Sequence, residues 1–329
     1  MVTPVKRSMG GALLVGAFAA CTPTFTDDTA IVSGPQLLAV QAVPAEAAPG
    51  ASFTMTALYV GPGGTEDPSS IDWAVCLLQN PLGDPDPIAP ACFVDASSSL
   101  SPLGDGASVS GSVPSNACEL FGPESPPPQP GVPGARPTDP DATGGFYLPV
   151  RVKSDGDVWS AALERIACQP SGVTQPVFKA FANGYVANQN PGVASLASVA
   201  SGGSTTMIAP DAPGAPPALT VSAGERTTLR VGWPSCPATP AACSGAEAYL
   251  VIDPTTKQIE TGRESIVASW YATTGRFDLD RVGREGTDTA TTVDNGWTAP
   301  SSPGRVRLWV VLRDARGGVG WGSYTIAVE

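Results

Sequence analysis

Glycine and proline recur throughout this chain and limit the length of the regular elements that it can form. Together they supply 72 of the 329 residues, as 37 glycines and 35 prolines. Proline ends or kinks a helix, and glycine weakens helices and strands alike. Many of the short segments between them alternate apolar with polar residues, which is the pattern of a half-buried strand. We therefore predict an all-β chain that is folded but rich in loops.

The alternating segments group into two sets of short strands. In the first half of the chain they are 37–43, 53–59, 71–75, 109–113 and 147–152. In the second half they are 219–221, 229–233, 249–251, 266–270, 306–312 and 324–328. Residues 314–318 (DARGG) suit a tight turn between the last two strands. Regular short strands with such punctuation are typical of β-sandwiches, and we predict two of them.

The N-terminus has the pattern of a secretory signal. Lys6 and Arg7 precede an apolar run over 9–18, which is shorter than the roughly 20 residues that a transmembrane helix needs. Residues 18–21 (FAAC) resemble the lipobox of bacterial lipoproteins. The resemblance implies that Cys21 is the mature N-terminus and carries lipid, a durable anchor when several acyl chains are attached. Cleavage after residue 20 that leaves a free Cys21 thiol is the alternative.

Composition then sets the expected boundaries. We predict a signal peptide at 1–20, a lipidated tether at 21–35, a first sandwich at 36–200, a Gly/Pro/Ser-rich linker at 201–217 and a second sandwich at 218–329.

Three local features are expected within the first sandwich. Residues 122–145 are rich in proline and are expected to leave the sheets as a loop, with a docking motif for a proline-binding module as the alternative. Short helices are expected at 157–166 and 176–184.

Cysteine usage agrees with export. Of seven cysteines, six remain once Cys21 is set aside, and an even set in an exported protein suggests three disulfides. Cys236 and Cys243 lie seven apart in one loop and are expected to pair. Three connectivities then remain for the other four, and short loops favour Cys76–Cys92 with Cys118–Cys168.

Charge and the absence of histidine restrict the possible functions. The net charge is −12, and it becomes about −14 when Lys6 and Arg7 are removed, which argues against nucleic acid or anionic lipid headgroups as partners. Without histidine, the chain has no Ser-His-Asp or Cys-His nucleophile and no histidine-ligated metal. We predict a protein that is not an enzyme and has no cofactor. A histidine-free hydrolase using paired carboxylates is the remote alternative.

Two groups of residues are candidate ligand sites. Four D-x-D pairs lack EF-hand spacing and are interpreted as loop acids, so no metal site is assigned: Asp84/Asp86, Asp139/Asp141, Asp155/Asp157 and Asp278/Asp280. Trp309 alternates out of phase with Leu308 and Val310, which places it on the outer face of the predicted sheet, and Trp321 follows the last turn. Both tryptophans are therefore a possible binding surface. Packing against the other domain or against 234–265 is the alternative for both tryptophans.

The C-terminal segment 297–318 resembles the end of bacterial Ig-like and PKD-like domains. It contains WTAP at 297–300, the alternating strand 306–312 and the DARGG turn, where those families have W-x-A-P, a strand and a D-x-x-G-G hairpin. Residues 36–59 are similar to the opening hairpin of such domains. The order of these segments, with cysteines between them, resembles predicted lipoproteins of unknown function that are common in myxobacteria. The resemblance implies tandem Ig-like sandwiches and no activity.

These observations predict a lipid-anchored cell-envelope protein that acts as a non-enzymatic binding or structural module. In enteric lipoproteins, Asp after the cysteine favours the inner membrane; Thr22 therefore predicts the bacterial outer membrane, facing the periplasm or the cell surface. The expected partners are the membrane, through the lipid, and another envelope protein or a glycan. A carbohydrate-binding or calcium-dependent surface adhesin is the alternative.

Overall fold

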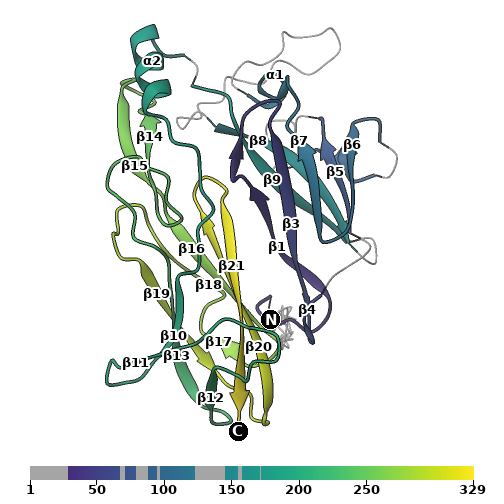
Figure 1. Ribbon diagram of the computed structural model, residues 1–329, viewed down its shortest axis with the longest axis vertical. Helices are drawn as coiled ribbons and strands as arrows, with labels where there is room; N and C mark the ends of the chain where they lie inside the picture. Colours follow the sequence, from purple (N-terminus) through teal and green to yellow (C-terminus); the bar gives the residue numbers. More distant parts are fainter. Residues whose placement is uncertain are drawn as a thin grey trace, which may run out of the picture.

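The computed structural model describes residues 29–66, 71–78, 88–94, 97–122, 145–154, 158–170 and 172–329. Over these residues the chain forms two β-sandwiches that lie side by side (Figure 1). The predicted all-β fold class with two β-sandwiches is confirmed. The predicted signal peptide, Cys21 and all but the ends of the proline-rich segment 122–145 lie outside the described residues.

The first sandwich packs a four-stranded sheet against a five-stranded sheet. The smaller sheet is built on β3 and contains β1 (Gln36–Val43), β3 (Ser52–Gly61), β4 (Gly64–Thr65) and β7 (Ser108–Ser112). The larger sheet has the order β2 (Glu46–Ala47), β9 (Val158–Ala167), β8 (Gly145–Ser154), β5 (Asp72–Cys76) and β6 (Leu100–Asp105). Phe53, Met55 and Trp73 fill the core between them. Two short helical turns flank these sheets, η1 (Pro90–Cys92) and α1 (Ala117–Phe121).

The second sandwich packs two five-stranded sheets. One has the order β11 (Thr205–Met207), β10 (Ser195–Val199), β13 (Arg226–Gly232), β19 (Thr292–Thr298) and β17 (Arg276–Phe277). The other has the order β12 (Leu219–Val221), β21 (Val319–Val328), β20 (Gly304–Asp314), β16 (Ile266–Ala272) and β18 (Arg281–Arg284). Trp270 and Trp297 are fully buried in its core. A separate ribbon of β14 (Ala248–Ile252) and β15 (Ile259–Arg263) leads into β16.

The helix predicted at 157–166 is wrong, because these residues belong to strand β9. β9 pairs with β8 in an antiparallel register of ten residues, from Gly145 opposite Ala167 to Ser154 opposite Val158. Ala162, Glu164 and Ile166 are buried at every second position while Leu163 is exposed, which is the period of a strand. The apolar spacing of this segment fits both periods, and only the partner strand decides between them.

The second predicted helix is confirmed as α2 (Gln175–Gly184), in which Phe181 is buried. It belongs to the other half of the molecule from the one expected. A Cβ atom at Gly184 would lie 2.8 Å from Leu250 of β14, so the end of this helix packs on the second sandwich. Figure 1 shows α2 at the end of the β14–β15 ribbon.

The predicted linker at 201–217 does not separate the sandwiches. β10 precedes it yet pairs with β13 of the second sandwich, and β11 lies within it. The chain leaves the first sandwich before α2, and the segment that follows α2, which contains the fully buried Asn188, runs between the two sandwiches and is bonded to both. Composition identified a loop-rich stretch, but the crossing is set by which strands hydrogen-bond to one another.

The predicted tether 21–35 is also corrected over its described part. Ala30 and Val32 are buried at 1% and 0% exposure, and the amide of Val32 donates to the carbonyl of Ala272 at 2.8 Å. Ala30 joins the core of the second sandwich and Val32 joins the apolar cluster between the sandwiches, so the segment is part of the fold from Thr29 onward. Neither helix among the described residues combines the length and hydropathy that a membrane span requires.

Candidate functional site

The six cysteines after Cys21 form three disulfides. The pairs are Cys76–Cys92, Cys118–Cys168 and Cys236–Cys243, as the sequence favours. The first two close loops of the first sandwich, and the third closes a loop between β13 and β14 of the second. No paired cysteine is available as a thiolate for catalysis or metal binding.

Trp309 does not form an exposed platform. Its side chain is 1% exposed and packs between the sandwiches in an apolar cluster with Leu38, Leu58 and Val311. Trp321 is half-buried and packs against the same cluster. Both indoles therefore pack against the neighbouring domain, which was the alternative to an exposed binding surface. Strands β1 and β3 cover the outer face of the β16–β20–β21 sheet at these tryptophans.

The one described D-x-D pair is engaged within the protein. Asp278 forms an ion pair with Arg226, and Asp280 accepts a hydrogen bond from Thr29 Oγ1 at 3.1 Å. The pairs at 84/86, 139/141 and 155/157 lie outside the described residues. In the part of the chain that the structure describes, no group of three or more Cys, Asp or Glu side chains is placed to hold a metal ion.

The residues that cross between the sandwiches are held on the first side by Glu46 of β2. Its Oε2 accepts from the Asn188 amide at 2.9 Å and from Arg165 Nε at 3.2 Å, and its Oε1 accepts from the Tyr185 hydroxyl. Glu46 and Arg165 are both nearly fully buried. A buried carboxylate needs such partners, because an unpaired one is very costly. Burial, followed by the charge of Glu46, raises the pKa of Tyr185, so its hydroxyl remains a donor.

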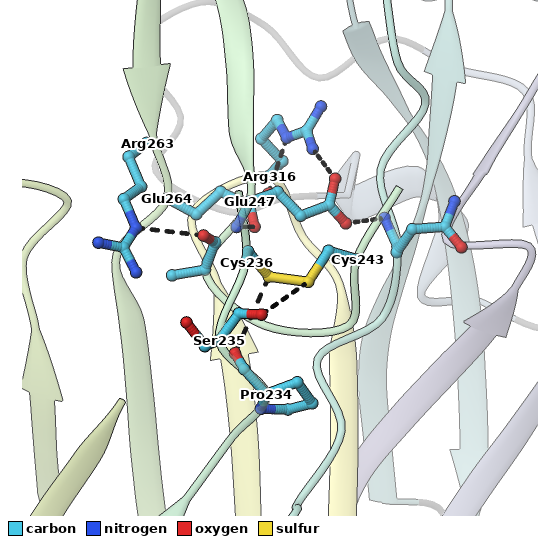
Figure 2. Close-up of a disulfide and its surroundings, with 10 residues drawn as sticks. Pro234, Ser235, Cys236, Cys243, Glu247, Arg263, Glu264 and Arg316 are labelled. Atoms are coloured by element: carbon cyan, nitrogen blue, oxygen red, sulfur yellow. Dashed lines mark hydrogen bonds and ion pairs between the residues drawn. A yellow bond between two sulfur atoms is a disulfide. The ribbon is translucent and has the colours of Figure 1, made fainter. Parts of the chain in front are cut away.

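On the second side the same segment is held by Arg316, in the turn between β20 and β21. Its Nε donates to Glu264 at 2.7 Å and its Nη2 donates to Glu247 at 2.8 Å. Its Nη1 donates to the Val186 carbonyl at 3.2 Å, and Glu247 accepts from the Gln189 amide at 2.9 Å. Figure 2 shows the Arg316 side chain between the two glutamates, above the Cys236–Cys243 disulfide. The crossing segment is therefore bonded to both sandwiches.

Asp314 orients the turn that carries Arg316. Its Oδ1 accepts from the backbone amides of Arg316 at 2.9 Å and Gly318 at 2.8 Å. Gly317 has φ of 97°, a conformation that favours glycine. The Tyr147 hydroxyl of β8 donates to the Arg316 carbonyl at 3.1 Å, which adds a direct bond between the sandwiches.

We call these side chains the junction cluster, and it buries more negative than positive charge. Its members are Glu46, Arg165, Asn188, Glu247, Glu264, Asp314 and Arg316. Burial raises the pKa of Glu264 to about 8 and of Glu247 to about 7, although Arg316 opposes both shifts. Burial also raises the pKa of Asp314. One guanidinium cannot neutralise three buried carboxylates, so the cluster retains protons near neutral pH.

An open hollow of about 690 Å³ lies on the other side of the disulfide. Its walls come from the disulfide loop, the β14–β15 ribbon and the loop after β18: Ser235, Cys236, Pro237, Ala238, Ala248, Thr261, Gly262, Arg263, Glu285, Gly286, Thr287 and Thr289. Arg263 donates from Nε to the Ala246 carbonyl at 3.2 Å, which orients its guanidinium. The hollow thus combines four hydroxyls with one cation and one exposed carboxylate.

The sequence alone does not indicate the junction cluster. Arg316 sits in a turn that reads as solvated, and buried charges have no local signature. One signal was present in the β14–β15 hairpin, whose last pair at the open end is Ala248 opposite Arg263. Glu247 precedes Ala248 and Glu264 follows Arg263, so the two carboxylates lie opposite each other at that end. Opposed carboxylates at that position imply a cation between them.

Comparisons with known proteins add little. No family model and no curated protein sequence matches the chain. Among solved structures, the D00-D0 domain of intimin shares 8% identity, covers 88% of this chain and 99% of that one, and has a TM-score of 0.22. The Yersinia pseudotuberculosis adhesin InvE shares 11% identity, covers 88% of this chain and 58% of that one, and has a TM-score of 0.21.

Activated alpha-2-macroglobulin from Escherichia coli shares 10% identity over 90% of this chain and 22% of that one, with a TM-score of 0.20. This chain thus spans less than two thirds of the length of InvE and of the macroglobulin. TM-scores this low support no conclusion about the fold or the function of this chain.

Proposed function

We propose that this chain is a lipid-anchored cell-envelope protein that acts as a non-enzymatic binding or structural module at the outer membrane. The observation that carries the proposal is the pairing of all six cysteines after Cys21. Stable disulfides form in oxidising compartments outside the cytoplasm, which supports export through the N-terminal signal. Cys21 is then the one cysteine left for a different chemical role, and lipidation is the role that its FAAC context supports.

The junction supports a module that presents its surface rigidly. The sandwiches share an apolar cluster around Trp309 and Val60, and the crossing segment is bonded to both of them. Buried apolar contacts and hydrogen bonds from one segment to both sandwiches oppose relative domain motion. A rigid pair of sandwiches suits a protein whose function is to hold a binding surface in a set position.

A binding role for the hollow beside Cys236–Cys243 is favoured by its chemistry. Its volume lies in the range of small-ligand sites, about 300–1,000 Å³. Hydroxyls from Ser235 and Thr261, with Arg263 and Glu285, suit a polar ligand with several hydroxyl groups, such as an envelope glycan. This second candidate replaces the D-x-D acids and the tryptophans as the glycan-binding surface, since Asp278, Asp280 and Trp309 already have partners within the protein.

The anchor is tested by Cys21→Ser in the intact cell, followed by membrane fractionation and by incorporation of a labelled fatty acid. We expect the variant to lose the label and leave the membrane fraction while keeping its three disulfides. Thr22→Ser is the matched control and should stay membrane-bound and labelled. A Cys21→Ser protein that remains in the membrane fraction would refute the lipid anchor.

A further inference from the structure

The described chain begins bonded to the middle of the fold. The amide of Val32 donates to the Ala272 carbonyl at 2.8 Å, and the amide of Ala272 donates to the Ala30 carbonyl at 2.9 Å. Thr29 Oγ1 donates to Asp280 at 3.1 Å, and Ala30 and Val32 are buried. The polypeptide is therefore held by the second sandwich from Thr29 onward, at the end of β16.

This attachment limits the distance between the fold and an anchor at Cys21. Only residues 22–28 separate Cys21 from Thr29. An extended chain covers at most about 3.6 Å per residue, so the two Cα atoms lie no more than roughly 29 Å apart. The surface that meets the membrane must be within that reach of Thr29.

The opposite end of the second sandwich lies beyond this reach. Strands β15 and β16 run from Ile259 to Ala272 almost without a break. At about 3.3 Å per residue, the fourteen residues span roughly 40 Å, which places the β14–β15 turn far from Thr29. Figure 1 agrees, with α2, β14 and β15 at one end and β4 and β17 toward the other.

The surface near Thr29 also carries unpaired positive charge. Arg281 and Arg305 are exposed, and neither guanidinium has a hydrogen bond or ion pair with any residue that the structure describes. Arg281 lines a small cavity with Thr29. Arg305 lies two residues before Arg307, whose Nε would lie 3.7 Å from a Cβ atom at Gly64 of the β3–β4 turn. Arginine binds phosphate groups well.

The two sandwiches differ in charge in a way that favours this end. With the division placed before α2, residues 36–174 contain 15 acidic and 4 basic residues, a net charge of −11, whereas residues 175–329 contain 13 acidic and 12 basic residues, a net charge of −1. The free arginines thus belong to the nearly neutral sandwich. Electrostatic repulsion from an anionic lipid surface is therefore much stronger for the first sandwich than for the second.

We propose that the anchored protein meets the membrane through the surface formed by Arg281, Arg305 and the β3–β4 turn, with the two arginines contacting lipid phosphates. This inference rests on the lipid anchor at Cys21 from the proposed function. The acidic chain has too little positive charge to be recruited by anionic lipid alone, so the arginines orient a protein that the lipid has already attached. The hollow beside Cys236–Cys243 and the β14–β15 turn then face away from the bilayer.

Orientation is tested by energy transfer from a dye on the protein to an acceptor on lipid headgroups. The full-length lipidated protein is purified and placed in vesicles, and one cysteine is introduced for the dye. Gly63→Cys puts the dye at the β3–β4 turn, where a Cβ atom meets nothing within 4 Å, and Thr255→Cys puts it at the exposed β14–β15 turn. We expect transfer to be at least twofold more efficient from position 63 than from position 255. Equal transfer, or the reverse order, would overturn the orientation.

The arginines are tested in the same vesicles. The difference between positions 63 and 255 should widen when phosphatidylglycerol replaces part of the phosphatidylcholine, and Arg281→Ala with Arg305→Ala should remove that widening. A difference that does not depend on lipid charge would overturn the arginine contacts. Failure of the anchor is distinguishable, because an unlipidated protein would not stay with the vesicles and would show no transfer from either position.

Discussion

The two sandwiches share an architecture but differ in how they are stabilised. The second has a core that contains Trp233, Trp270 and Trp297, one short disulfide loop and almost balanced charge. The first carries a net charge of −11 and two disulfides, one of which closes a loop of 50 residues. A cross-link stabilises most when it closes a long loop of the unfolded chain. The first sandwich thus relies on covalent links where the second relies on packing.

They also treat buried charge differently. In the second sandwich, Glu247 and Glu264 share Arg316. In the first, Glu164 of β9 is fully buried between Ala162 and Ile166 of the core face, and neither of its carboxyl oxygens has a hydrogen-bond partner among the described residues. Burial raises the pKa of Glu164 to about 8, with a further contribution from Glu46. The first sandwich therefore accommodates a protonated acid that weakens it.

The largest expected difference comes from the disulfides. Replacing both Cys118 and Cys168 with Ala should destabilise the first sandwich by about 4 kcal/mol, and replacing both Cys236 and Cys243 should cost the second about 2.5 kcal/mol, from the entropy of loops of 50 and 7 residues. Urea unfolding, with hydrogen exchange read separately over each sandwich, measures both. Equal costs would show that the two sandwiches do not differ in their dependence on cross-links.

The second effect is a dependence on pH. The carboxyls of Glu164, Glu247 and Glu264 have ordinary pKa values near 4.5 when unfolded and values of about 7–8 when folded. Between these values the folded state binds the extra protons, so raising the pH favours unfolding. We expect stability to be fully present near pH 4.5 and to fall by at least about 4 kcal/mol as the pH rises above 8, a decrease in Tm of roughly 8–16 °C.

A matched pair of variants assigns that effect to one sandwich or the other. Glu264→Gln cannot ionise and should flatten the pH dependence in the second sandwich, and Glu164→Gln should do so in the first. Calorimetry from pH 4.5 to 8.5 is the measurement. A Tm that rises over this range would contradict the assignment of protonated carboxyls to both sites.

The smallest expected effect is a gain in stability. Glu164→Leu removes a buried polar group without partners and should stabilise the first sandwich by about 1–2 kcal/mol at pH 7. Glu247→Leu is the contrasting variant and should destabilise, because it takes a partner from the buried Arg316 guanidinium. A Glu164→Leu variant less stable than the wild type would show instead that the Glu164 carboxyl is hydrogen-bonded in the folded state.

Much of the fold followed from local pattern. Alternation identified β3, β16, β20 and β21, and loop length favoured the three disulfides that form. Local pattern failed where two periods fit the same residues, as in β9, and where a strand has its partners far along the chain, as β10 does. It failed again at Trp309, because exposure depends on which surface the other sandwich covers.

By itself, the sequence determined an all-β chain of short strands and the residues of a lipoprotein-like N-terminus, and it favoured one pairing of the cysteines. The tertiary structure decided where the sandwiches meet and what holds them. Glu46 binds Arg165 across 119 residues and Arg316 binds Glu247 across 69, so the residues next to either arginine in the chain do not predict its partner. Periodicity is a property of neighbours, whereas the cost of burying a charge depends on partners that only the folded chain brings together.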